Sequence, residues 1–268
     1  MTTDIFFLGN CQASRMVQFY NMFTPGPQKK PALFRSITPH FGEYHEDETI
    51  SLLETAPVAV VQLINSEYVF NRKSVLDMRA GKPTIFLPYV YLPGFRRLEK
   101  LSSKGVPRID GADILITEMN YAEQANQAAI SFMRGQIDGQ NKTRFQASLA
   151  EMKHREALGA DVKIADYIQQ TYQEKMPCFA INHPTPHVLT EMYNQVAHLA
   201  GFVPAPTKMT PYDLGRATLP AGNGGLTPYC VDALDLDYPH ETHWFSANNK
   251  ITGEIARKWD RNRILERS

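Results

Sequence analysis

The stretch Ile5-Phe6-Phe7-Leu8-Gly9-Asn10-Cys11-Gln12 places a short apolar run directly before a turn signal. The four apolar residues predict a buried strand, because a strand that is covered on both faces shows no polar alternation. Glycine then lets the backbone turn sharply. The next segment, residues 12–23, carries apolar side chains at helical spacing, namely Met16, Val17, Tyr20 and Phe23. The sequence therefore predicts a strand, a tight turn at Cys11 and a helix.

A cysteine on such a turn is a candidate nucleophile. The first N–H groups of a helix have no intrahelical partner and favour negative charge, so we expect them to stabilise the Cys11 thiolate. The alternative hypothesis is that Cys11 is a small apolar residue at the end of a strand. The turn alone does not decide between these two roles.

Composition narrows the class of protein. The chain has 268 residues, of which 43% are hydrophobic, enough for a globular core. Basic and acidic residues balance at 28 each, so no net charge gathers nucleic acid. The cysteines Cys11, Cys178 and Cys230 lack paired spacing, and His240 and His243 lack a third ligand, so no metal is expected. No basic leader and no run of ~18 apolar residues is present. We expect a soluble cytoplasmic protein without a membrane span, and the oligomeric state is open.

Further apolar runs predict more strands, at residues 58–61, 84–87, 112–117 and 178–181. They alternate with helical patterns, which is typical of an α/β domain with a parallel sheet and helices on both faces. The predicted sheet passes through Phe6, Val60, Phe86, Leu115 and Phe179. We expect an α/β domain over residues 1–201 with a helical insertion at about residues 120–175. Residues 202–268 are predicted to form an irregular wrap or lid and a C-terminal helix, packed on the same domain.

Two polar residues follow predicted strands. Gln62 ends the strand at residues 58–61, at the edge where open α/β sheets bind ligands. Its amide is expected either to donate to a developing oxyanion or to hydrogen-bond loop backbone. His183 follows residues 178–181 and precedes a helix that Gly201 closes. In one parallel sheet, Cys11 and His183 would lie at the same edge, so His183 is the predicted base. The alternatives are a structural hydrogen bond for His183 and a catalytic role for His187.

Four segments carry a resemblance to a known family. They are Gly9-Asn10-Cys11-Gln12-Ala13, Val60-Val61-Gln62 with Tyr68, His154-Arg155-Glu156 leading into Asp166-Tyr167-Ile168, and residues 179–184 with Asn182-His183-Pro184. In their order and spacing they resemble the WcbI-type polysaccharide biosynthesis family, over roughly residues 4–201. The resemblance implies capsular polysaccharide O-acetylation with coenzyme A or acetyl-CoA as substrate. It also implies a three-layer core similar to that of SGNH hydrolases.

The predicted site combines the argument from the Cys11 turn and the strand ends with the family resemblance. The predicted catalytic residues are Cys11, His183, Asn10 and Gln62. The predicted coenzyme A-binding residues are Gly9, Gln12, Arg15, Tyr68, Arg96, Arg97, Arg155 and Asn182. An aromatic loop at residues 88–95 runs into Arg96, Arg97 and Lys100. Aromatic rings beside cations suit the binding of a nucleotide. The alternative is that the tyrosines of this loop pack against the domain. Lys29 and Lys30 are predicted to form a basic loop with Arg35. They are the alternative ligands for the phosphates of coenzyme A if Arg96 and Arg97 do not bind them.

Three functional hypotheses follow. The first is an acyltransferase that moves an acetyl group from coenzyme A to a sugar hydroxyl of a polysaccharide precursor. The second keeps the cysteine and uses water as acceptor, which gives a thioesterase or carbohydrate esterase. The serine expected of such hydrolases is replaced here by Cys11. The third is a non-catalytic module that binds a nucleotide or coenzyme A.

Overall fold

The computed structural model describes residues 4–37, 46–64, 69–92, 98–99, 108–109, 140–180 and 182–208. These residues divide into two compact units. The first holds the described residues up to 90 together with residues 151–169 and 184–208, and the second holds the others. Among the residues described, no helix is long and apolar enough to cross a membrane.

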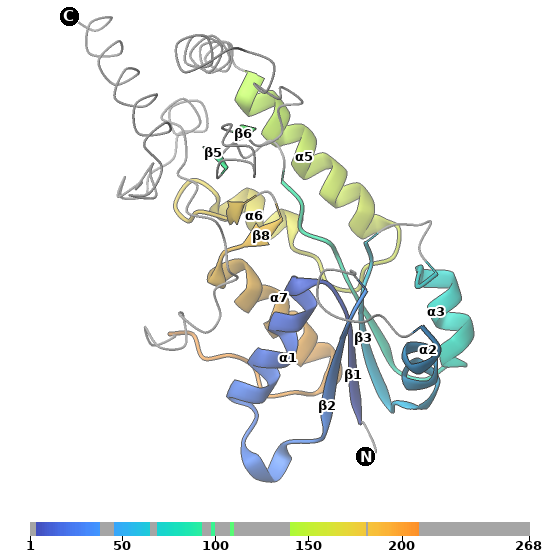
Figure 1. The fold of residues 1–268 in the computed structure, drawn as a ribbon. Helices are drawn as coiled ribbons and strands as arrows, with labels where there is room; N and C mark the ends of the chain where they lie inside the picture. The colour runs from blue at the N-terminus through green and yellow to red at the C-terminus, as the bar shows by residue number, and fades with distance from the viewer. Residues whose placement is uncertain are drawn as a thin grey trace, which may run out of the picture. The chain divides into compact units, whose positions relative to one another are not determined.

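A four-stranded parallel sheet forms the centre of the first unit (Figure 1). Its strands are β1 (Ile5–Gly9), β2 (Ala32–Ser36), β3 (Val58–Gln62) and β4 (Thr84–Leu87), in the order β2-β1-β3-β4. In register, Phe7 of β1 lies between Phe34 of β2 and Val60 of β3. The predicted strands around Phe6, Val60 and Phe86 are confirmed. Because all pairs are parallel, the carboxyl ends of the strands meet at one edge.

Helices cover both faces of this sheet (Figure 1). α1 (Cys11–Phe23) and α7 (Pro186–Ala200) lie on one face, and α2 (Glu46–Thr55) and α3 (Arg72–Arg79) lie on the other. Side chains alternate along β1, so this strand serves both layers. Phe6 and Leu8 join the apolar cluster with Leu53 of α2, whereas the Phe7 and Tyr20 ring centroids are 6.4 Å apart on the α1 side. The predicted α/β class with helices on both faces is confirmed.

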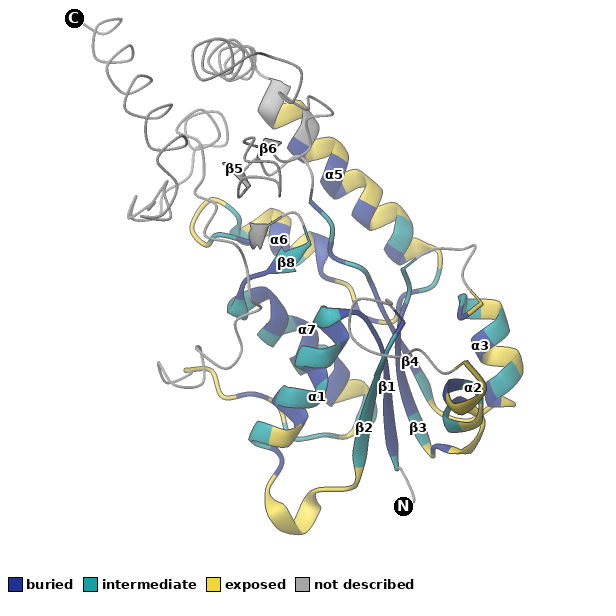
Figure 2. Ribbon diagram, in the orientation of Figure 1, coloured by how far each residue is buried: buried dark blue, intermediate teal, exposed yellow. Residues whose placement is uncertain are grey.

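The strand β2 corrects part of the sequence analysis. Lys29 and Lys30 do follow a short 3-10 turn, η1 (Gly26–Gln28), but Arg35 lies in β2 and not in a loop. Every residue of β2 is half-buried, as the teal colour of this strand in Figure 2 shows. An edge strand of this kind has neither a continuous apolar run nor a clean alternation, so periodicity does not reveal it.

The strand at Phe179 is the second correction. β7 (Cys178–Ala180) pairs with β8 (His183–Pro184) in a separate two-stranded sheet, so the prediction that it extends the parallel sheet is wrong. An apolar run indicates burial, but it does not say which sheet a strand joins. The strand predicted around Leu115 lies outside the described residues, as does the region predicted as a wrap from residue 209 onward.

The remaining elements are mainly helical. α5 (Gln140–Ala157) and α6 (Ala165–Thr171) confirm two predicted helices, while their role as an insertion stays a prediction. β5 (Leu98–Glu99) pairs antiparallel with β6 (Arg108–Ile109). In the second unit the rings of Phe145 and Tyr172 pack with centroids 4.6 Å apart. α7 ends as predicted at Gly201, whose φ of 70° is the left-handed conformation that glycine adopts most easily.

Candidate active site

The turn between β1 and α1 is closely packed at Gly9. A Cβ atom at this position would lie 2.6 Å from the Cβ of Ala13 and 2.7 Å from the Cβ of Gln62. Carbon atoms do not approach so closely, so only glycine fits here without a shift of the backbone. The first turn of α1 therefore rests directly on the end of β3. Gly9 itself is buried and shapes the turn.

Asn10 is the N-cap of α1. Its side-chain oxygen accepts a hydrogen bond from the backbone N–H of Gln12 at 2.8 Å, which satisfies one of the free donors at the helix start. Its own backbone N–H donates to Gln62 Oε1 at 3.0 Å. Asn10 is only 6% exposed. These contacts make it a residue that builds the turn, and its role towards an oxyanion stays a prediction.

Gln12 and Gln62 continue this network across the carboxyl edge of the sheet. Gln62 Nε2 donates to Gln12 Oε1 at 2.9 Å and to the carbonyl oxygen of Pro88 at 3.4 Å. Gln12 Nε2 donates to the carbonyl oxygen of Val90 at 2.9 Å, and the Val90 N–H donates back to Gln12 Oε1 at 3.1 Å. The two glutamine side chains are fully buried. The start of α1, the end of β3 and the segment after β4 are thus joined by side-chain amides.

The hydrogen bonds of Gln62 bear on the two roles predicted for its amide. Both N–H atoms of its amide are used within the network, and almost none of the side chain is exposed. The structure therefore shows a hydrogen bond to loop backbone, and a role of Gln62 towards an oxyanion stays a prediction. Gln12, predicted to bind coenzyme A, is also enclosed, and its binding of the coenzyme stays a prediction. Val90 was not predicted, because a contact between residues so far apart leaves no local pattern.

The Cys11 side chain is half-buried at the start of α1. Burial raises the pKa of the Cys11 thiol, because the thiolate loses solvation. The backbone N–H groups of Cys11 and Gln12 and the charge of Arg15 act in the opposite direction and lower this pKa, but burial outweighs them. The expected stabilising contribution of the N–H groups at the helix start is therefore present, although burial is the larger effect on the pKa of this thiol. A reaction at this thiol needs a base.

Arg15 lies one turn after Cys11 on the same face of α1. It is half-buried, and its Nη1 donates to Gln18 Oε1. Burial lowers the pKa of the Arg15 guanidinium, while the neighbouring Cys11 thiolate raises it. Among the predicted binding residues that the structure describes, Arg15 is the cation that acts on the Cys11 thiolate.

Asn182 and His183 belong to the second unit, where Asn182 lies in the turn before β8 and His183 is the first residue of β8. His183 is half-buried, and burial lowers the pKa of its imidazole, which favours the neutral ring. Its Nδ1 is buried, and no described residue hydrogen-bonds it. Because β7 is not part of the parallel sheet, the argument that the sheet brings His183 to the edge of Cys11 no longer holds. The pairing of these two residues stays a prediction.

His187, the alternative base, lies in the first turn of α7. Its Nδ1 is 3.2 Å from the hydroxyl oxygen of Tyr167 on α6. Burial, with a smaller effect of Glu191, raises the pKa of the Tyr167 phenol, which therefore remains protonated. The ring of His187 is thus engaged by Tyr167 of α6, and its role as the base stays a prediction.

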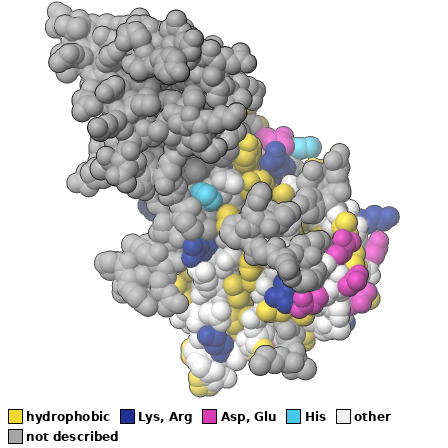
Figure 3. Space-filling model, viewed as in Figure 1, with side chains coloured by type: hydrophobic (Ala, Val, Ile, Leu, Met, Phe, Trp, Pro, Cys, Tyr) yellow, Lys and Arg dark blue, Asp and Glu magenta, His cyan; other side chains and the backbone are white. Residues whose placement is uncertain are grey.

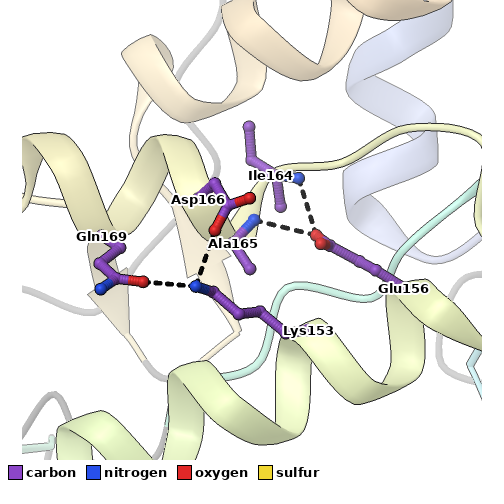
Figure 4. A network of polar contacts seen from close by, with 6 residues as sticks. All are labelled: Lys153, Glu156, Ile164, Ala165, Asp166 and Gln169. Carbon is purple, nitrogen blue, oxygen red and sulfur yellow. Dashed lines mark hydrogen bonds and ion pairs between the residues drawn. The ribbon is translucent and has the colours of Figure 1, made fainter.

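The segment around Arg155 has a structural role that is clear in Figure 4. Glu156 Oε1 accepts hydrogen bonds from the backbone N–H groups of Ile164 and Ala165, at 2.7 and 2.9 Å, and so caps the start of α6. Lys153 Nζ lies 2.7 Å from Asp166 Oδ1 of α6. Burial raises the pKa of Glu156 despite these N–H groups. This part of the family resemblance therefore includes residues that join α5 to α6.

Arg155 itself is half-buried and pairs with the exposed Glu151 on the same helix, at 2.7 Å between Nε and Oε1. It matches the alternative of a surface charge, and its binding to coenzyme A stays a prediction. On the face that Figure 3 shows, the visible lysine and arginine side chains are scattered among acidic and apolar ones. The predicted residues Tyr68, Arg96 and Arg97, and Lys100, lie outside the described residues.

Lys29 and Lys30 lie beyond the C-terminal end of α1, whereas Cys11 begins this helix. The Tyr20 hydroxyl accepts a hydrogen bond from the Lys30 N–H at 2.7 Å and fixes this loop. The fallback site for phosphates is therefore a helix length away from the thiol. Within the described ranges, no three His, Cys, Asp or Glu side chains gather as a metal site would require.

Comparison with known proteins gives a family and a fold. A family model described as polysaccharide biosynthesis enzyme WcbI matches residues 5–205. No curated protein matches the chain. One solved structure is that of WcbI, described as a novel polysaccharide biosynthesis enzyme, in its native form without a disulfide bond between coenzyme A and one of its cysteines. It is 13% identical, with a TM-score of 0.62, and the match covers 97% of this chain and 91% of that one. At this identity the likeness shows the fold.

Proposed function

The chain belongs to the WcbI family of polysaccharide biosynthesis enzymes, and from that premise we propose that it is a coenzyme A-dependent acyltransferase. The acyl donor is acetyl-CoA or a close relative, and the acceptor is a sugar hydroxyl of a polysaccharide precursor. The description of the WcbI structure names coenzyme A together with a cysteine, which supports a thioester as donor.

The position of Cys11 carries this proposal. Of the two cysteines in the described part of the chain, Cys178 is fully buried and Cys11 is half-buried. Cys11 also begins a helix, where backbone N–H groups approach its sulfur. A thiol that can be reached and that has such donors beside it suits attack on a thioester.

The first half of the reaction forms an acyl-cysteine. His183, neutral at physiological pH, takes the proton of the Cys11 thiol, and the thiolate attacks the thioester carbonyl. The backbone N–H groups at the start of α1 stabilise the oxyanion, and Asn10 and Gln62 hold those groups in place. The C–S bond to coenzyme A then breaks, and the coenzyme A thiolate takes the proton from the imidazolium. His183 is neutral again at the end of this half.

The second half transfers the acyl group to the sugar. The same imidazole accepts the proton of the sugar hydroxyl as its oxygen attacks the acyl-cysteine carbonyl. The bond to Cys11 breaks, and the departing thiolate regains its proton from His183. The products are the sugar ester and free enzyme, so protons and bonds balance over the cycle. Because burial raises the pKa of the Cys11 thiol, the first half depends on a base that removes its proton, and the second half depends on an acid that returns a proton to the departing thiolate.

Coenzyme A is held mainly by cations in this proposal. Arg15 follows Cys11 by one turn and is the described cation best placed for the coenzyme, with Arg96 and Arg97 as further phosphate ligands. Tyr68 and Asn182 are assigned to the same ligand from the family resemblance. A near-neutral chain needs such a local cluster to gather a polyanion.

Acylation in the absence of sugar tests the proposal. The protein is incubated with acetyl-CoA, quenched in acid and digested, and the peptide that contains Cys11 is examined for an acetyl group by mass spectrometry. Sugar nucleotides and oligosaccharides are then added as acceptors. Cys11→Ala should lower transfer by about a thousandfold or more. The matched control Cys178→Ala, at a fully buried cysteine, should keep transfer in the folded fraction.

The other outcomes identify the competing hypotheses. Rapid release of acetate without any sugar makes the protein a thioesterase or esterase. Stabilisation by coenzyme A, with no turnover that depends on Cys11, makes it a binding module. His183→Ala should lower transfer about as much as Cys11→Ala, and damage by His187→Ala alone would reassign the base.

A further inference from the structure

The Gln12 side chain pairs with the main chain of Val90 in both directions. It donates to the Val90 carbonyl oxygen at 2.9 Å and accepts from the Val90 N–H at 3.1 Å, as a neighbouring strand would. Its oxygen also accepts from Gln62 Nε2 at 2.9 Å. These groups are buried, so water does not replace a bond that is lost. One amide thus connects the residue after Cys11 to both neighbouring chain segments.

The backbone of Gln12 lies where it affects the thiol. Its N–H is held by Asn10 Oδ1 at 2.8 Å, and the same N–H is one of the two backbone donors that act on the Cys11 sulfur. A rotation of this residue would turn the donor away from the sulfur. The side-chain amide opposes such a rotation, because it is fixed at its far end by Val90.

We infer that Gln12 is a positioning residue for the chemistry at Cys11: by holding Val90 and Gln62, it keeps the backbone donors at the start of α1 beside the sulfur. Gln12 is enclosed and touches no reacting atom itself. The inference deepens the proposed transfer reaction and rests on it for the kinetic readout, whereas its effect on the thiol is independent of any acyl transfer.

The segment that Gln12 holds also borders the site. Pro88 and Val90 are buried and Tyr89 between them is half-buried, which is the alternation of an extended segment. Pro88 is reached by Gln62 and Val90 by Gln12. Tyr89 is therefore carried on backbone that two amides fix relative to the Cys11 turn.

The chain offers a matched control for Gln12. Gln195 of α7 makes the same two-way pairing with the main chain of Lys163, at 2.8 Å in each direction, near the protein surface. Gln12→Met and Gln195→Met remove the same pair of bonds without adding charge. Gln12→Asn and Gln195→Asn keep an amide that is one methylene too short to make them.

The test measures the rate at which iodoacetamide modifies Cys11 as a function of pH, by mass spectrometry of its peptide. We expect both Gln12 variants to react about tenfold more slowly at neutral pH, which corresponds to a thiol pKa about one unit higher. In the transfer assay kcat should fall about tenfold and KM for acetyl-CoA should change by less than about twofold. Both Gln195 variants should retain the wild-type profile.

Two results would overturn the inference. One is a folded Gln12→Met protein, verified by circular dichroism, whose Cys11 pH profile matches wild type. The other is an equal shift in the Gln195 variants, which would show a general effect of lost stability. If Gln12→Met does not fold, Gln12→Asn decides by the same criteria. A shifted pH profile without any transferase activity would refute the proposed function and leave the positioning role intact.

Discussion

Gln12 and Gln195 make the same pair of hydrogen bonds in different surroundings. Each amide donates to a main-chain carbonyl and accepts from the N–H of the same residue, Val90 in one case and Lys163 in the other. The pair at Gln12 is fully buried between strand ends, and the pair at Gln195 is near solvent. Water can replace the second pair and not the first. We therefore expect the contribution of a polar contact to the stability of this protein to depend on its burial more than on its geometry.

Gly9→Ala is expected to have the largest effect, because it separates the layers that the buried amides join. The new methyl group would overlap Ala13 and Gln62, so the start of α1 must move off β3. We expect a loss of about 3 kcal/mol in the free energy of unfolding. Urea denaturation measures it, and an unchanged midpoint would show that the turn adapts freely. Gly26→Ala is the control, because a Cβ there meets nothing.

The two glutamines themselves give the direct test of the comparison. Gln12→Met leaves the Val90 N–H and carbonyl and the Gln62 amide without their partner in a buried place, which should cost about 2 kcal/mol. Gln195→Met should cost less than about 0.5 kcal/mol, as surface changes usually do. Thermal unfolding of both variants is the measurement. Equal losses would break the argument that burial separates the two regions.

The sequence predicts the strands β1, β3 and β4 because each is a continuous apolar run that is buried on both faces. It misses β2, whose half-buried edge position leaves no pattern, and it misplaces β7, because burial does not identify the sheet that a strand joins. The turn at Cys11 was likewise predictable from Gly9 and the helix pattern. The hydrogen bonds that hold this turn were not predictable, because Gln12 and Val90 are 78 residues apart and no local sequence pattern marks their contact.

The net shift in the pKa of the Cys11 thiol was also not predictable from the sequence. The spacing of the turn predicts which donors approach the sulfur, and these donors do lower its pKa. How much solvent the thiol loses depends on all the chain around it, and that contribution is the larger one. Glu156 illustrates the same limit, because its role as the cap of α6 depends on a loop that brings Ile164 and Ala165 back to α5.

The buried carboxyl of Glu156 allows the comparison between buried and exposed polar contacts to be tested as a function of pH. Burial raises the pKa of its carboxyl in the folded state, so the folded state holds its proton to higher pH than the unfolded state. This contribution to stability is fully present below the pKa of the carboxyl in the unfolded state, and it is lost as pH rises through its pKa in the folded state. Glu156→Gln keeps an acceptor for the two N–H groups, so we expect a loss below about 1 kcal/mol near pH 4.

The loss at Glu156→Gln should shrink as pH rises above 4.5, the ordinary value for this carboxyl. Urea denaturation at pH 4, 5, 6 and 7, which spans about the range where carboxyl linkage acts, measures the difference from wild type. Glu151→Gln removes the same charge from the exposed side of α5 and is the control. A difference that grows with pH would mean that the N–H groups of the cap outweigh burial.

Arg155→Ala should have the smallest effect, because its partner Glu151 lies on the same exposed helix face. An i,i+4 pair in water contributes about 0.3 to 0.5 kcal/mol, since the charges are screened and two long side chains must be ordered. Thermal unfolding in low salt should reveal this loss, and high salt should remove it. Isothermal titration with coenzyme A on the same variant then separates the two roles of Arg155. Unchanged affinity for coenzyme A would mean that Arg155 only pairs with Glu151 on the helix surface. A salt-dependent loss of affinity would mean that Arg155 also binds coenzyme A.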